Sequence, residues 1–339
     1  MDSVCCFRPV PPPGLRVCWE ITSRCNLLCP HCFTYPPVRP ELPLTRMVEI
    51  VEEMASAGVR RVLLTGGEPL MSPHLDALCH ALTDNSILID VNTNATMANA
   101  RRLRELASAG VKELTVSLDG GSADDYERCR PGAKFDTVLG NIRTAIALGF
   151  SVDLTFVPTA LNFHAFQEVA RLAEKLKASS LTVAGLVAFQ RARDNQALLA
   201  LHPDQVEELC LKIDLMRNEL HTPIWSNRLR TPKPTRPCVA GKNIVGIDAS
   251  GYMHPCPLYV LPFTRANDLT QHPFVDILRD QNFYPQTLTP NGMVECFNCP
   301  HAPNCPGGCL GVKRKLELPA GGPDPLCAEP ARMSVHTYS

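Results

Sequence analysis

The chain has 339 residues, of which 45% are hydrophobic and 20% are charged, and its formal net charge is −1. This composition is ordinary for a globular protein, and the length allows an α/β domain with a smaller second domain. The balanced charge gives no reason to expect nucleic-acid or anionic-membrane binding, and no apolar run approaches the length of a membrane span.

Residues 15–221 alternate between short apolar stretches and amphipathic stretches with helical spacing. The expected strands are 15–21, 60–65, 87–91, 112–118, 152–157 and 180–186, and the expected helices are 44–57, 73–82, 98–109, 135–148, 164–176 and 203–220. Repeated strand–helix units predict a parallel sheet with right-handed crossovers, as an open doubly wound sheet or a partial (β/α)6 TIM-like barrel. In both arrangements the chemistry belongs in the loops after the strands.

The composition changes beyond residue 221. Residues 222–237 contain four prolines with basic residues between them, which predicts a linker between domains. The following residues 238–327 are rich in Cys, Pro and Gly, and we expect a small domain that metal ions hold together. An N-terminal extension (1–14), a core domain (15–221) and a C-terminal tail (328–339) complete the expected organisation.

The sixteen cysteines point to metal or redox chemistry. The first residues lack the layout of a signal peptide, so we expect a cytoplasmic protein, in which structural disulfides are rare. Ten cysteines fall in two spaced groups, and the other six are scattered: Cys5, Cys6, Cys18, Cys79, Cys129 and Cys210. Helical spacing assigns Cys79 and Cys210 to the hydrophobic core.

The first group is Cys25-x3-Cys29-x2-Cys32, directly after the first expected strand. Three thiolates are one fewer than a [4Fe–4S] cluster needs, so such a cluster would keep one iron open for a ligand that is not the protein. The alternative is a zinc loop in which His31 supplies a fourth ligand. The spacing favours the cluster.

The loop after the second expected strand reads Gly66-Gly67-Glu68-Pro69, and with the cysteine motif it resembles the radical S-adenosylmethionine (radical SAM) superfamily. The resemblance covers about residues 15–221 and implies a partial (β/α)6 barrel. It also implies that the open iron binds SAM, which reductive cleavage converts into a 5′-deoxyadenosyl radical, with the electron supplied by a partner such as flavodoxin or ferredoxin.

The resemblance implies roles for further residues. Gly66 and Gly67 would let the backbone approach SAM, and Glu68 with neighbouring backbone groups would receive its amino group. The other cofactor-binding residues that it implies are Pro69, Asn94, Ser117, Asp119 and Arg130, with Ser117 the candidate on the ribose and Arg130 near the carboxylate. Ala95 stands where the family has Gly after Thr-Asn. Cys129, expected in the loop after the fourth strand, is the candidate catalytic residue, as a hydrogen-atom donor.

The second cysteine group resembles the SPASM domain, which carries auxiliary clusters in radical SAM enzymes. By this resemblance the first auxiliary [4Fe–4S] cluster is bound by Cys238, Cys256 and Cys309, and the second by Cys296, Cys299, Cys305 and Cys327. The first cluster then lacks one protein ligand. Cys18 or Cys129 completes it, or its open iron binds substrate or solvent.

The resemblance implies an oxidoreductase that abstracts a hydrogen atom from a peptide or protein substrate and passes one further electron to the auxiliary clusters. Crosslinking or dehydrogenation during the maturation of a ribosomal peptide is the leading hypothesis. Only about fourteen residues precede the first expected strand, so we expect leader recognition by a separate partner protein or by the barrel mouth. The alternatives are a radical dehydrogenase of an aminosugar, nucleoside or tetrapyrrole precursor, and a non-enzymatic metal-binding scaffold.

Overall fold

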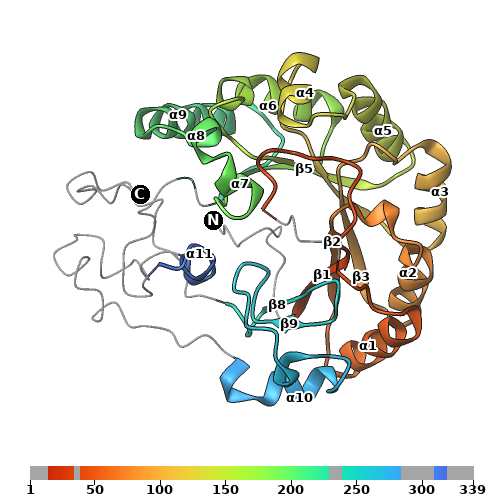
Figure 1. The fold of residues 1–339 in the computed structure, drawn as a ribbon. Coiled ribbons are helices and arrows are strands. Elements are labelled where there is room, and N and C mark those ends of the chain that lie inside the picture. Colours follow the sequence, from red (N-terminus) through yellow and green to blue (C-terminus); the bar gives the residue numbers. More distant parts are fainter. Residues whose placement is uncertain (1–13, 34–38, 228, 230–238, 284–308, 319–339) are drawn as a thin grey trace.

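The computed structural model describes residues 14–33, 39–227, 229, 239–283 and 309–318, which are built around one curved sheet (Figure 1). The sheet has nine strands in the order β7-β6-β5-β4-β3-β2-β1-β8-β9. Their bounds are β1 (Arg16–Thr22), β2 (Arg61–Gly66), β3 (Leu88–Thr93), β4 (Glu113–Ser117), β5 (Ser151–Phe156), β6 (Ser180–Ala184), β7 (Ile224–Asn227), β8 (Ile244–Ile247) and β9 (Met253–His254). All neighbours from β7 to β8 are parallel, and β9 is antiparallel to β8. The predicted parallel α/β sheet is confirmed.

The larger helices run around the outside of the curve, whereas α11 lies on its open side (Figure 1). The α-helices are α1 (Leu44–Ser56), α2 (Leu75–Asp84), α3 (Ala100–Ser108), α4 (Ala123–Cys129), α5 (Phe135–Ala147), α6 (Phe166–Leu176), α7 (Arg191–Asp194), α8 (Gln196–Leu199), α9 (Pro203–Glu219), α10 (Phe274–Arg279) and α11 (Leu310–Lys315). Short 3-10 helices are η1 (Pro69–Met71), η2 (Phe163–Ala165), η3 (Arg265–Asn267) and η4 (Gln281–Phe283). Among these described helices, none combines the length and the apolarity that a membrane crossing requires.

The two faces of the sheet differ in chemistry because side chains alternate along each strand. Val17 and Trp19 of β1 lie in the main hydrophobic core beneath the outer helices. In strands β2 to β6, the alternate residues, which face the concave side of the sheet, are largely polar. Thr115 Oγ1 donates to the Asp90 carboxylate at 3.0 Å, and Ser180 Oγ donates to Asp153 Oδ1 at 2.6 Å. The concave face therefore offers hydrogen-bonding groups beneath the loops that follow the strands.

The sheet extends further at both edges than the repeated units of the sequence suggest. Residues 222–237, expected as a linker, contribute strand β7, which pairs with β6. At the other edge, β8 from the cysteine-rich region pairs with β1 in parallel register, with Cys18 opposite Gly246. The cysteine-rich region thus continues the sheet of the core.

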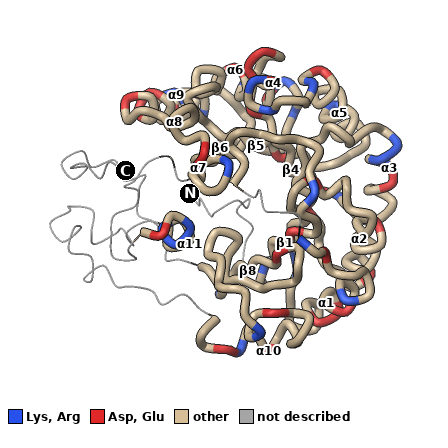
Figure 2. Tube along the Cα trace, viewed as in Figure 1, with Lys and Arg blue, Asp and Glu red and all other residues tan. Residues whose placement is uncertain are grey.

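Helix α4 is a second difference, because its residues were expected in a loop. Ser122 caps this helix by accepting a hydrogen bond from the Asp125 N–H at 3.3 Å, and Asp124 and Asp125 lie in the first turn. Acidic residues near a helix N-terminus are stabilising. Over the outer helices, basic residues (Lys and Arg) and acidic residues (Asp and Glu) are interspersed (Figure 2).

Candidate active site

The cysteine loop and the Gly-Gly-Glu-Pro turn pack directly against each other at the end of β1 and β2. The Gly67 N–H donates to the Thr22 carbonyl at 2.8 Å, and the Glu68 N–H donates to the Arg24 carbonyl at 2.7 Å. A Cβ on Gly67 would lie 2.1 Å from the Arg24 carbonyl oxygen, so only glycine permits this approach. The two glycines therefore allow the two loops to pack closely against each other. The approach of the glycine backbone to SAM stays a prediction.

The three thiols of the loop differ in exposure: Cys25 is exposed, Cys29 is buried and Cys32 is partly buried. Hydrogen-bond donors face two of the sulfurs. The Leu27 N–H donates to Cys25 Sγ at 3.4 Å, and Arg130 Nη1 donates to Cys29 Sγ at 3.9 Å. Burial raises the pKa of Cys29 to about 11, against the opposing effect of Arg130. A thiol in this setting becomes a thiolate ligand when cationic metal supplies the missing positive charge.

His31, the fourth ligand in the zinc alternative, is turned toward a different partner. Its Nε2 lies 3.2 Å from Asp119 Oδ2, and its side chain is 7% exposed. Within the part of the chain that the structure describes, no three His, Cys, Asp or Glu side chains are arranged to hold one metal ion. Because His31 faces Asp119, the loop offers three thiols without a histidine as fourth ligand, which suits a [4Fe–4S] cluster better than a single zinc ion.

Glu68 joins the loops after β2 and β3. Its carboxylate accepts hydrogen bonds from Thr93 Oγ1 at 2.7 Å, from the Asn94 N–H at 2.8 Å and from the Leu70 N–H at 3.1 Å. The side chain is 1% exposed, and burial raises its pKa. These contacts give Glu68 a role in holding the two loops together, and its contact with SAM stays a prediction.

Asn94 contacts the cysteine loop, with Nδ2 donating to Asn26 Oδ1 at 3.0 Å, and its role in SAM binding stays a prediction. Its neighbour Ala95 has φ +57°, a left-handed conformation that glycine adopts without strain. The turn is thus the one that Gly would form, built with Ala. The Ala95 N–H donates to Thr93 Oγ1 at 3.0 Å, and Asn141 Nδ2 donates to the Ala95 carbonyl at 2.8 Å.

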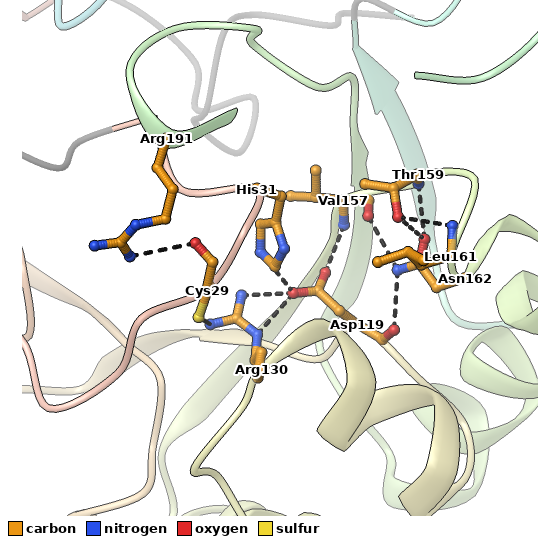
Figure 3. A network of polar contacts seen from close by, with 9 residues as sticks. All are labelled: Cys29, His31, Asp119, Arg130, Val157, Thr159, Leu161, Asn162 and Arg191. Atoms are coloured by element: carbon orange, nitrogen blue, oxygen red, sulfur yellow. Dashed lines mark hydrogen bonds and ion pairs between the residues drawn. The ribbon is translucent and has the colours of Figure 1, made fainter. Parts of the chain in front are cut away.

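Asp119 and Arg130 form a buried ion pair beside Cys29 (Figure 3). Arg130 Nε and Nη2 lie 2.7 and 2.6 Å from Asp119 Oδ2, and the Val157 N–H donates to Asp119 Oδ1 at 2.8 Å. Burial alone would raise the pKa of Asp119, but Arg130 and His31 hold it below its usual value. Both residues were predicted to bind SAM. The structure brings them to the cluster loop, with the Asp119 carboxylate 0% exposed.

Helix α7, which follows β6, contacts the cysteine loop from the other side. The Ala192 N–H donates to the Cys32 carbonyl at 3.3 Å, and Arg191 Nη1 donates to the Cys29 carbonyl at 3.4 Å (Figure 3). Sequence reasoning missed both of these residues and the role of His31. The position of His31 inside the cysteine motif was a signal, but nothing local marks Arg191 or Ala192.

Of the remaining predicted residues, Ser117 ends β4 at the same edge of the sheet, and Pro69 opens η1 beside Glu68. Cys129 is the last residue of α4 and is 1% exposed, and burial raises its pKa to about 12. Its position therefore gives no support to a hydrogen-atom donor. Several predicted ligands lie outside the described residues: Cys238, Cys296, Cys299, Cys305 and Cys327.

Comparisons with known proteins agree with this site. Residues 19–174 match the Radical SAM superfamily. Mycofactocin maturase MftC of Mycobacterium ulcerans is 27% identical over 92% of this chain and 87% of its own length. The AdoMet-dependent heme synthase of Nitratidesulfovibrio vulgaris is 23% identical over 95% of both chains. The PqqA peptide cyclase of Gluconobacter oxydans is 24% identical over 94% of this chain and 92% of its own.

A solved structure shares the fold. Streptococcus suis SuiB bound to its precursor peptide SuiA superposes with a TM-score of 0.75 at 18% sequence identity. The superposition covers 93% of this chain and 76% of SuiB. The curved sheet described above is therefore a known fold.

Proposed function

The chain carries a radical SAM domain over residues 19–174, and from this premise we propose that it is an enzyme that oxidatively modifies a peptide substrate. The observation that carries the proposal is the three-thiol loop, which the Gly-Gly-Glu-Pro turn contacts through two backbone hydrogen bonds and which Arg130 contacts at a sulfur. Cys25, Cys29 and Cys32 would hold a [4Fe–4S] cluster. With SAM bound and an electron from the proposed reducing partner, that cluster would supply the radical chemistry that removes a hydrogen atom from the substrate.

The residues around the loop fix its position for this chemistry. Asp119 anchors Arg130 and His31, and Glu68 ties the turn after β2 to the start of the loop after β3. Preorganised groups of this kind hold a reacting centre in place without rearranging during the reaction. We assign Asn94, Ser117 and the backbone of the Gly66–Gly67 turn to SAM binding, as the resemblance implies.

Two relatives support a peptide as the substrate: one is named a peptide cyclase, and SuiB was solved with a precursor peptide. The polar concave face of the sheet suits this class, because Thr115 and Asp90 belong to a layer of hydrogen-bonding groups that peptide amides can join. We further propose two auxiliary clusters bound by the C-terminal cysteines, an electron-donating partner, and leader recognition by a partner protein or the barrel mouth. We place the protein in the cytoplasm, where its sixteen cysteines stay reduced.

A mass measurement tests the substrate. The reconstituted and reduced enzyme is mixed with SAM and with short peptides encoded next to its gene, and the products are analysed by mass spectrometry. The proposal expects one of these peptides to lose two hydrogen atoms as 5′-deoxyadenosine forms. The variant Cys29→Ala is the control.

The similarity to a heme synthase, over 95% of both chains, favours a second candidate function, the oxidation of a tetrapyrrole precursor. The same assay with iron-containing tetrapyrrole precursors of heme as substrates separates the two. Turnover of the tetrapyrrole with no change in any peptide would contradict the peptide proposal and leave the radical SAM assignment intact.

A further inference from the structure

Three cysteines from distant segments lie in one small hydrophobic core on the concave side of the sheet. This second core contains Cys18, Leu63, Val187, Ala240, Ile244, Cys256, Leu258 and Val312, with Cys309 packed against it. The neighbours of Cys18 along β1, Val17 and Trp19, lie in the main core on the opposite face. The Cys18 side chain therefore points away from the outer helices, into the space that the cysteine-rich region covers.

Strand pairing brings Cys18 close to Cys256. Cys18 pairs with Gly246 in the parallel register of β1 and β8. Paired residues of neighbouring strands project from the same face, about 5 Å apart. A Cβ on Gly246 would lie 3.3 Å from the Cys256 carbonyl carbon and 3.1 Å from the Pro257 nitrogen. The Cys18 side chain thus leaves β1 on the side where the Cys256–Pro257 backbone covers the sheet.

Cys309 reaches the same segment through α11, whose N-cap it forms. A Cβ on Gly311 would lie 2.6 Å from the Leu258 carbonyl carbon, so α11 rests on the chain just after Cys256. Arg314 Nε also donates to the Val260 carbonyl at 2.7 Å. Helix α11 therefore holds Cys309 near Cys256.

Cys256 has the same local geometry as Cys25 in the first cysteine loop. The Leu258 N–H donates to Cys256 Sγ at 3.5 Å, as the Leu27 N–H donates to Cys25 Sγ at 3.4 Å. A backbone donor two residues on partly offsets the negative charge of a thiolate ligand. The resemblance to the SPASM domain implies that Cys256 and Cys309 bind one cluster that lacks a protein ligand, with Cys18 and Cys129 as candidates to complete it.

We propose that Cys18 is the missing ligand of the first auxiliary [4Fe–4S] cluster, which Cys256 and Cys309 also bind. This inference rests on the proposed function. Cys129 is the wrong candidate, because it ends α4 beside Asp119 and Arg130 and does not belong to the second core. Cys238, the remaining cysteine that the resemblance implies for this cluster, lies outside the described residues. Strand β1 then carries an auxiliary ligand within it and leads into the SAM-cluster loop at its end.

The test isolates the auxiliary clusters by replacing Cys25, Cys29 and Cys32 together with Ala. In this background the iron content, the electron paramagnetic resonance of the dithionite-reduced protein, and spectral changes on adding cyanide are compared with and without Cys18→Ala. We expect the parent to resist cyanide at both auxiliary clusters. With Cys18→Ala, one cluster signal changes, takes up cyanide at its open iron, and loses an iron on mild oxidation. Cys129→Ala, the matched control, should leave all three readouts unchanged.

Cys18→Ser covers the case in which the smaller residue prevents folding, because it preserves the size of the side chain while replacing the sulfur ligand. It should shift the same cluster signal and leave the other unchanged. A parent that already binds cyanide and does not respond to either Cys18 variant overturns the proposal, as does a response to Cys129→Ala instead. A triple-Ala background without iron overturns both this proposal and the auxiliary clusters, whereas SAM cleavage by the unmodified protein tests the radical SAM reaction separately.

Discussion

The guanidinium of Arg130 donates two hydrogen bonds to one carboxylate oxygen of Asp119, over 2.7 and 2.6 Å. This pair holds the third nitrogen, Nη1, at 3.9 Å from Cys29 Sγ. Asp119 is fully buried and also contacts His31 of the cysteine loop. The loops after β1 and β4 are therefore joined by one charge network, and that network ends on a thiol of the cluster loop.

Arg130→Gln should lower the reduction potential of the cluster that binds SAM. Hydrogen bonds and positive charge at the sulfurs stabilise the reduced cluster. A hydrogen bond to a charged group contributes about 1.5–3 kcal/mol, which for a one-electron couple corresponds to a decrease of roughly 65–130 mV. Potentiometric titration followed by electron paramagnetic resonance measures the change, and the cluster is recognised by its response to SAM.

Arg128→Gln is the matched control, because it removes the same charge from an exposed position on α4. It should leave the potential unchanged. If Arg130→Gln instead weakens SAM binding at an unchanged potential, Arg130 contacts the SAM carboxylate, as the family resemblance implies, and does not tune the cluster.

Gly67→Ala should disrupt the cluster loop. Its Cβ would meet the Arg24 carbonyl at 2.1 Å, so the turn and the loop must separate and lose the hydrogen bonds from Gly67 and Glu68. We expect a loss of most cluster incorporation, with destabilisation of about 2–4 kcal/mol. Gly140→Ala in α5 is the control, since nothing lies within 4 Å of its Cβ, and it should stabilise by about 0.5–1 kcal/mol. Equal iron content in both variants would contradict the role of Gly67.

Ala95→Gly should change the free energy of unfolding by less than about 1 kcal/mol, because relief of the left-handed strain is offset by the loss of a buried methyl group and by the greater freedom of glycine in the unfolded chain. Urea unfolding of the two proteins measures the difference. Ala145→Gly is the comparison: this buried alanine lies inside α5 in an ordinary helical conformation, so its replacement relieves no strain and should cost about 2 kcal/mol. If both variants are destabilised alike, the turn at Ala95 does not have the conformation described.

Asp90→Asn should flatten the dependence of stability on pH. Burial raises the pKa of Asp90 from 3.8 to about 7, opposed by the hydrogen bond from Thr115. The folded protein therefore binds a proton that the unfolded chain has released, and stability falls as the pH rises toward 7. Between pH 5 and 8 we expect a loss of about 2–3 kcal/mol in the wild type that the variant lacks. Urea unfolding at both pH values measures it, and equal losses in the two proteins would refute it.

The local features of the site were predictable from the sequence. Alternating strand and helix patterns placed the cysteine loop and the Gly-Gly-Glu-Pro turn after adjacent strands, and parallel pairing then puts both at one edge. Ser122 with Asp124 and Asp125 was a readable start signal for α4, which the sequence reasoning overlooked.

Contacts between distant segments were not predictable in the same way. His31 within a cysteine motif reads as a metal ligand until folding places Asp119 beside it. β7 lies in a proline-rich stretch, and only its pairing with β6 identifies it as an edge strand. Similarly, Cys18 has no spacing relation to Cys256, and the pairing of β1 with β8 relates the two.

The most direct test is SAM cleavage by the anaerobically reconstituted and reduced protein, with 5′-deoxyadenosine quantified by chromatography. Three four-iron clusters correspond to roughly twelve irons per chain. The wild type should release 5′-deoxyadenosine, and the variant with Cys25, Cys29 and Cys32 all replaced by Ala should release none while it keeps the iron of the two auxiliary clusters that we propose. Release of 5′-deoxyadenosine by this variant at the wild-type rate would contradict the assignment of the three-thiol loop as the site of the radical reaction.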